Sequence, residues 1–197
     1  MGAGGAALGA IGAAAPSWAS TSASGASGAT YQSIDELLAR QTGVASPTQN
    51  AVRRISLLNL HTDERCSVVY REAGQAIPDA LSEVNRVLRD FRTGEVHPID
   101  TRLLDLMADL SVKMDASGPF HIISGYRSPA TNSMLHDKSD GVATRSLHMQ
   151  GMAVDIRLPG RPLTKVRDTA LAMSRGGVGY YAKSDFVHVD VGRVRRW

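Results

Sequence analysis

Two short stretches of the sequence carry the residue types of a catalytic metal site. The first is Ser146–Asp155, which contains His148 and Asp155, and the second is Asp185–Asp190, which contains His188. Histidine nitrogens and carboxylate oxygens are the usual ligands of catalytic zinc, which keeps one position open for water. Bound zinc lowers the pKa of this water to about 7 and polarises a scissile carbonyl, so the pattern indicates carbonyl hydrolysis.

The spacing within these stretches allows the ligands to converge. Residues 153–156 and 186–191 have the composition of β-strands. Side chains alternate between the two faces of a strand, so Asp155 and His188 each lie on one defined face of their strand. If the two strands lie side by side, we expect His148 from the preceding loop, Asp155 and His188 to bind one Zn²⁺ ion.

The two stretches also carry a resemblance to a known family. The pattern Ser-x-His-x-x-Gly-x-Ala-x-Asp over 146–155, followed by Asp-x-x-His over 185–188, resembles the zinc peptidases that include the D-Ala-D-Ala peptidases and the hedgehog signalling domain. Residues 124–129 and 176–181 resemble the murein endopeptidase K branch of that superfamily. The resemblance extends over about 54–197 and implies an α+β fold, with a small central antiparallel sheet carrying the zinc site and helices flanking it.

The resemblance implies a general base. Asp185 matches the acidic residue that precedes the last ligand of the family, so we expect it to move a proton from water to the leaving amine. Positions three apart on a strand face opposite sides, which means that Asp185 needs a bend at residues 184–185 to act beside His188. Asp190, two positions after His188, is the alternative base, and we expect it instead to hold His188 or support the cleft.

Two further residues belong to the expected site. Arg127 matches a family arginine that binds a substrate carboxylate or stabilises an oxyanion, and a guanidinium suits both tasks. A surface arginine paired with a carboxylate is the simpler alternative. Ser146 stands two residues before His148, and we expect it to bond to the backbone or to orient that histidine, as groups around metal ligands usually do.

The resemblance implies an enzyme that hydrolyses peptide cross-links between peptidoglycan stem peptides. The bond is either D-Ala to meso-diaminopimelate or diaminopimelate to diaminopimelate, and the residues do not choose between them. A D,D-carboxypeptidase or dipeptidase acting on small D-Ala peptides is one alternative. A zinc-bearing cell-wall binding module without turnover is another, although Asp185 and Arg127 favour catalysis. We expect cross-linked stem peptides as the partner and a monomeric protein.

The overall composition excludes several other classes. A net charge of +3 over 197 residues, with 43% hydrophobic residues, suits one folded domain plus an extension and argues against a dedicated nucleic-acid binder. No stretch is apolar enough for a transmembrane helix. Cys66 is the only cysteine, so no intrachain disulfide can form. The Arg193, Arg195 and Arg196 cluster is most simply a solvated end of the chain.

The chain divides into three parts. Residues 1–29 have no charged side chain and resemble the later part of a secretory signal whose basic start is missing, which predicts a periplasmic or otherwise exported protein. Residues 30–52 read as a linker with a short helix that starts at the capping box Ser33–Glu36. Residues 53–197 form the expected zinc peptidase domain.

Hydrophobic periodicity predicts the elements of this domain. We expect a β-hairpin from strands over 54–61 and 66–70. Further strands are expected over 120–124, 153–156, 178–181 and 186–191, and helices over 78–92, 98–114, 130–136 and 162–174.

Overall fold

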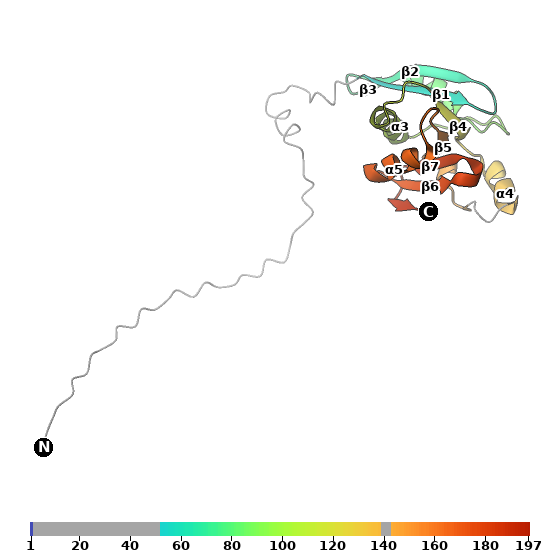
Figure 1. Cartoon of the computed structure of the whole chain (residues 1–197). Coiled ribbons are helices and arrows are strands. Elements are labelled where there is room, and N and C mark those ends of the chain that lie inside the picture. The colour runs from blue at the N-terminus through green and yellow to red at the C-terminus, as the bar shows by residue number, and fades with distance from the viewer. Residues whose placement is uncertain (2–51, 139–142) are drawn as a thin grey trace.

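The computed structural model describes Met1 and residues 52–138 and 143–197 (Figure 1). The signal-like segment 1–29 and the helix expected after Ser33 lie outside these residues, so the division of the chain into three parts stays a prediction. Within the described part of the chain, no helix is both long and apolar enough to cross a membrane.

The described residues build one eight-stranded sheet in the order β3-β2-β1-β4-β5-β7-β6-β8. Most neighbours are antiparallel, while β1 pairs with β4 and β6 pairs with β8 in parallel. The strands are β1 Arg53–Asn59, β2 Arg65–Glu72, β3 Gln75–Ala76, β4 Phe120–Ser124, β5 Ala153–Arg157, β6 Gly177–Tyr181, β7 Phe186–Asp190 and β8 Arg195–Arg196.

The α+β class is confirmed, but the expectation of a small antiparallel sheet is wrong. The β1–β2 hairpin forms as predicted, with Leu57 opposite Cys66. It does not stand apart, because β1 also pairs with β4 and thereby joins the sheet that carries β5. Burial of Leu57 and Leu58 stabilises this arrangement. A two-residue strand at the end of the chain then extends the other edge beside β6.

Three helices build the core against one side of the sheet, and they are α2 Pro78–Val87, α3 Thr101–Lys113 and α5 Leu163–Met173. Their apolar residues form one buried cluster with the valines and isoleucine of β5 and β7. Figure 1 shows α3 and α5 side by side at one end of the domain and α4 (Pro129–Lys138) at the other. Asp100 caps the start of α3, since its side chain accepts a hydrogen bond from the backbone N–H of Arg102.

Alternation along β5 and β7 separates the core from the candidate site. Val154 and Val189 lie opposite each other and are fully buried in the core. Asp155 lies opposite His188 on the other face of the same two strands. The turn before β5 depends on Gly151, whose φ is +66° and whose added Cβ would lie 2.2 Å from a backbone oxygen.

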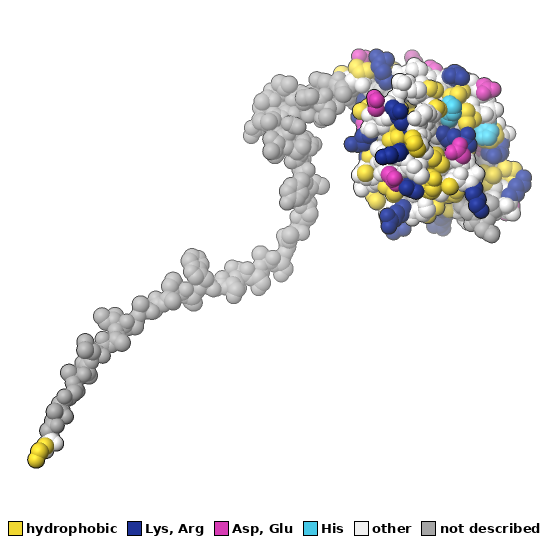
Figure 2. Space-filling model, in the orientation of Figure 1, with side chains coloured by type: hydrophobic (Ala, Val, Ile, Leu, Met, Phe, Trp, Pro, Cys, Tyr) yellow, Lys and Arg dark blue, Asp and Glu magenta, His cyan; other side chains and the backbone are white. Residues whose placement is uncertain are grey.

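Charged side chains are spread over the surface of the domain. Figure 2 shows one face on which Lys and Arg side chains are interspersed with acidic and apolar ones. No single stripe of positive charge runs across this face.

Candidate metal centre

Three donor atoms converge at the centre of the sheet. Nε2 of His148 lies 3.2 Å from Nδ1 of His188 and 3.3 Å from Oδ1 of Asp155, and the last two atoms are 2.9 Å apart. The three side chains are buried. His148 comes from the 3₁₀ helix Leu147–Gln150, Asp155 from β5 and His188 from β7. The structure brings the three expected ligands together.

The geometry of the three atoms fits one metal ion. Zinc–ligand bonds of about 2.0–2.2 Å in a tetrahedral site place ligand atoms about 3.3 Å apart. The other ring nitrogen of each histidine is already committed: Nδ1–H of His148 donates to the carbonyl of Gly125 at 2.7 Å. Nε2–H of His188 donates to Asp190 at 3.0 Å. Both remaining nitrogens therefore point at the Asp155 oxygen, an arrangement of three donor atoms that suits a metal cation among them.

The pKa shifts of His148 and Asp155 favour the forms that bind metal. Burial lowers the pKa of His148, which favours the neutral imidazole. Burial raises the pKa of Asp155, but the two neighbouring histidines, His148 first, outweigh it and hold the pKa well below its usual range. The carboxylate is therefore ionised. Neutral imidazole and ionised carboxylate are the forms that ligate metals.

Arg127 lies beside the cluster and forms an ion pair with Asp155. Its guanidinium donates to Oδ2 of Asp155, the oxygen that faces away from the histidines, and to Oγ of Ser124 at 2.8 Å. Arg127 also lines the groove above the cluster. Ser146 contacts the backbone of His148, not its ring, because its Oγ accepts the N–H of His148 at 3.4 Å and caps the 3₁₀ helix.

Asp190 lies behind His188. It is fully buried, and it accepts hydrogen bonds from the backbone N–H groups of Gly177 and Gly192 in addition to His188. Arg195 donates to both oxygens of Asp190, to Oδ1 at 3.1 Å and to Oδ2 at 2.8 Å. This arrangement supports the expected role of holding His188. The interpretation of Arg195 as a solvated side chain is wrong, because the turn after β7 brings its guanidinium to the buried carboxylate of Asp190.

The structure does not bring Asp185 into the cluster. The required bend is present, since Asp185 follows the 3₁₀ helix Ala182–Ser184 with a φ of +54°. Its carboxylate nevertheless points outward, is 65% exposed and pairs with Arg157 at 3.0 Å. Ser184 and Phe186 on either side of it both line the groove. The turn is therefore part of the groove wall, although its carboxylate is not.

A groove of about 770 Å³ opens over the cluster. One end is formed by His61 and Arg92, and the other by three aromatic side chains. Sequence reasoning missed four of these five residues, which are His61, Arg92, Phe186 and Trp197.

The aromatic end of the groove is a connected unit. The rings of Tyr181 and Phe186 stack at 4.5 Å, and Nε1–H of Trp197 donates to the hydroxyl of Tyr181 at 2.7 Å. The Trp197 ring lies on Gly179, where an added Cβ would come within 2.7 Å of it. Gly179 on β6 leaves room for the Trp197 ring. It is therefore the residue of the sequence that could have indicated this aromatic end of the groove.

Cys66 takes no part in the site. It lies on β2 within the core, and burial raises the pKa of its thiol to about 12. A thiol with this pKa supplies almost no nucleophilic thiolate at neutral pH.

Two histidines and one carboxylate on the floor of an open groove are the residue types of a metallohydrolase site. The match to a family model identifies the family within this class. Residues 47–197 match the model described as "Peptidoglycan L,D-endopeptidase MepK", and the chain belongs to this family.

Curated relatives agree with this match. The chain is 39% identical over 145 residues to the "Peptidoglycan L,D-endopeptidase MepK" of Escherichia coli (strain K12), a region that covers 74% of this chain and 80% of the relative. The relative from Shigella flexneri has the same name and the same figures. The "Probable peptidoglycan L,D-endopeptidase MepK" of Haemophilus influenzae is 38% identical over 146 residues, covering 74% of this chain and 78% of the relative.

The substitution Asp190→Asn tests the contact that holds His188. Replacing the charged acceptor of the Nε2–H weakens the orientation and basicity of this histidine, and such changes typically lower metal affinity about 10–100-fold. Titration of zinc against a chromophoric chelator would measure the change. Asp168→Asn, which alters an exposed acidic residue on α5, is the matched control and should keep full affinity. Unchanged zinc affinity in a folded Asp190→Asn protein would contradict the assigned role.

Proposed function

We propose that this chain is a zinc-dependent endopeptidase that cleaves the bond between two diaminopimelate residues of cross-linked stem peptides. Membership of the family makes the chain a peptidoglycan-hydrolysing peptidase. The observation that supports zinc dependence is the cluster of His148, Asp155 and His188, whose three converging donor atoms fit zinc on the floor of a groove.

The names of the relatives support one of the two bonds that the sequence left open. Those relatives are called L,D-endopeptidases. In a D-Ala to diaminopimelate link the acyl residue has the D configuration. In a link between two diaminopimelates, the acyl centre is L and the amine centre is D. We therefore favour the diaminopimelate to diaminopimelate cross-link as the substrate.

The shape of the groove supports an endopeptidase over a carboxypeptidase. Its lining extends past the cluster in both directions along the sheet, to His61 and Ile123 on the side of β4 and to Phe186 and Trp197 on the side of β7 and β8. A groove that continues on both sides can hold peptide before and after the scissile bond. A carboxypeptidase needs only a short pocket beyond it.

Zinc, Asp185 and Arg127 would have different roles in the reaction. Zinc would lower the pKa of a bound water to about 7 and polarise the scissile carbonyl. Asp185 would accept a proton from the attacking water and return it to the leaving amine, once its carboxylate turns from Arg157 into the groove. Catalytic hydrogen bonds often form only in the substrate complex. The donors of Arg127 that face the groove would bind the substrate carboxylate or the oxyanion.

We further propose that the protein acts outside the cytoplasm, as a monomer, and that residues 1–29 direct its export. The substrate supports this location, because stem peptides are cross-linked outside the cytoplasmic membrane. A non-catalytic zinc module is less well supported, since Arg127 lies at the metal ligands and the groove above them is open.

Product analysis separates the candidate activities. The protein from about residue 30 onward would be incubated with three purified substrates: a dimer linked through two diaminopimelates, a dimer linked through D-Ala, and a pentapeptide monomer. We expect mass spectrometry to show conversion of the first dimer to monomers. Release of D-Ala from the pentapeptide alone would instead establish a carboxypeptidase, and no product with zinc bound would favour the binding module.

A further inference from the structure

One end of the groove is built from a stack of three side chains. The imidazole of His61 and the ring of Phe91 lie 3.8 Å apart and are nearly parallel, and the guanidinium of Arg92 lies 4.2 Å from the centre of the Phe91 ring. Nε2–H of His61 donates to the carbonyl of Ile123 at 3.0 Å, which fixes the stack to the end of β4. His61 and Arg92 both line the groove.

A buried carboxylate fixes the backbone of this stack. Asp90 is 1% exposed, and it accepts the backbone N–H of Arg92 at 2.9 Å and both the N–H and the hydroxyl of Ser128 at 2.9 and 2.7 Å. Burial alone would raise the pKa of Asp90, but these hydrogen bonds lower it to about 2. Ser128 directly follows Arg127, so Asp90 ties the backbone of Arg92 to the segment beside the metal cluster.

The side chain of Arg92 has no acidic partner among the residues that the structure describes. Within that part of the chain, the groove is lined by Arg92, Arg127, Arg145 and Arg195 and by one carboxylate, that of Asp155. Arg127 binds Asp155 and Arg195 binds Asp190. The Arg92 guanidinium contacts an aromatic ring and leaves its hydrogen-bond donors available. Such a group is suited to bind a carboxylate with two parallel hydrogen bonds.

The position of Arg92 limits which carboxylate it can bind. His61 follows β1, which is the second neighbour of β5 in the sheet. Two strand spacings place this end of the groove about 10 Å from Asp155. This distance equals about three residues of extended backbone, a span that the long side chain of diaminopimelate or the γ-linked D-glutamate can cover. In a cross-linked stem peptide, the bound carboxylate is either the free carboxylate of diaminopimelate or the α-carboxylate of the preceding D-glutamate.

We infer that Arg92 is a specificity-determining residue that binds a free stem-peptide carboxylate about 10 Å from the metal cluster. The inference rests on the proposed endopeptidase function and adds a substrate requirement to it. Amidation of the bound carboxylate removes its charge and one acceptor. The enzyme therefore discriminates against stem peptides that are amidated at that position.

The test compares wild type and Arg92→Ala on three diaminopimelate-linked dimers: unmodified, amidated on diaminopimelate, and amidated on D-glutamate. We expect wild type to lose kcat/KM by about 10- to 100-fold on one of the two amidated dimers, mainly through KM. Arg92→Ala should lose a similar factor on the unmodified dimer and show no further loss on that amidated dimer. The dimer that shows this pattern identifies the carboxylate. Arg92→Lys should recover part of the activity.

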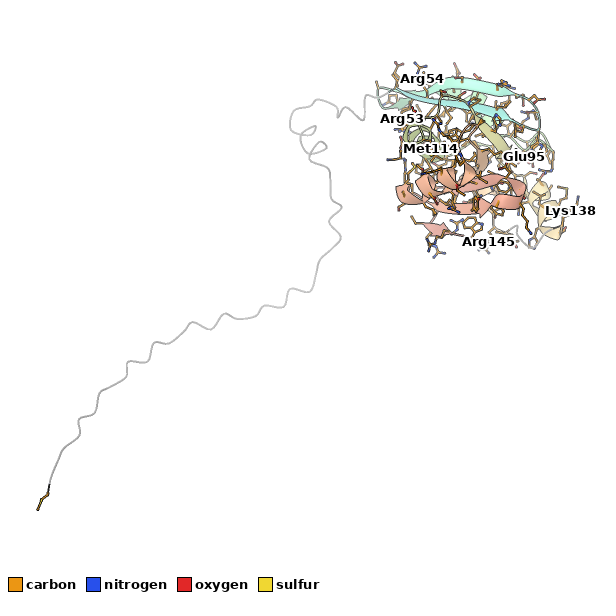
Figure 3. The ribbon with its side chains drawn as sticks, viewed as in Figure 1. Arg53, Arg54, Glu95, Met114, Lys138 and Arg145 are labelled. Atoms are coloured by element: carbon orange, nitrogen blue, oxygen red, sulfur yellow. The ribbon has the colours of Figure 1, made fainter. Side chains whose placement is uncertain are left out.

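The matched control is Arg54→Ala. Arg54 is exposed on β1, does not line the groove, and lies at the opposite edge of the domain from the groove residue Arg145 (Figure 3). Equal losses for Arg92→Ala on all three dimers, or no loss on any, would overturn the inference while the activity of wild type still supports the endopeptidase. Failure of wild type to cleave the unmodified dimer would overturn both.

Discussion

Replacing His188 with alanine is expected to abolish metal binding and reduce cleavage of cross-linked dimers to background. The substitution removes one of three ligands whose donor atoms lie 2.9–3.3 Å apart. The remaining imidazole and carboxylate cannot hold zinc with the geometry of a catalytic site. Loss of the metal removes several kcal/mol of transition-state stabilisation, which lowers kcat/KM by about 10³-fold or more. Metal content by mass spectrometry and turnover of dimers would measure both effects.

A second histidine of the same sheet provides the control. His121 lies on β4, is partly buried and does not line the groove. His121→Ala should therefore keep its zinc and its activity. His148→Ala should cause the same loss as His188→Ala, because Nε2 of His148 is another of the three converging donor atoms. A His188→Ala protein that is folded, binds zinc as wild type does and turns over would remove the basis of the proposed site.

The second large effect is expected for Asp185→Asn, which should lower kcat about 10²–10⁴-fold while zinc stays bound. Asparagine has nearly the same shape but cannot accept the proton of the attacking water. Asp185 lies outside the cluster, so its loss leaves the ligands untouched. Single-turnover rates at saturating zinc would separate this effect from metal loss.

Two comparisons make this prediction specific. Arg157→Ala removes the ion pair that holds Asp185 outward and should leave activity in place, because the carboxylate is then free to enter the groove. Asp190→Ala should lose activity through weaker zinc binding and recover it partly as zinc is raised. Full turnover of zinc-bound Asp185→Ala, together with lasting loss in Asp190→Ala, would show that Asp185 is not the base.

The metal cluster was predictable because its geometry is local. Period-two alternation places Asp155 and His188 on the outer face of β5 and β7, and the two residues are direct partners in the sheet. His148 needs only the tight turn at Gly151 to fold back toward them. Once these strands are read as neighbours, the three ligands follow without knowledge of the rest of the fold.

Other parts of the site depend on contacts that local spacing does not encode. The direction of the Asp185 carboxylate is set by Arg157 on another strand. The binding of Arg195 to Asp190 depends on the turn after β7. Local spacing also does not encode the size of the sheet, which was predicted too small, because the parallel pairing of β1 with β4 joins segments about 60 residues apart.

The groove end at Arg92 was missed for a related reason. It joins His61 after β1, Phe91 and Arg92 after α2, and Ile123 at the end of β4. Hydrophobic periodicity predicts a helix that continues to residue 92, but α2 ends at Val87. The side chain of Asp90 instead binds the backbone N–H groups of the following turn. Such capping by a single aspartate competes with helix extension and gives no periodic signal.

The most direct test of the metallopeptidase account is metal-dependent cleavage of the diaminopimelate-linked dimer. The protein would be stripped with a chelator, divided, and assayed with and without one equivalent of Zn²⁺, with metal content measured in each sample. The account predicts no monomer release from the stripped protein and restored release at one zinc per chain. Equal cleavage by the stripped and the zinc-loaded protein would contradict it, because the cluster of His148, Asp155 and His188 would then have no catalytic part.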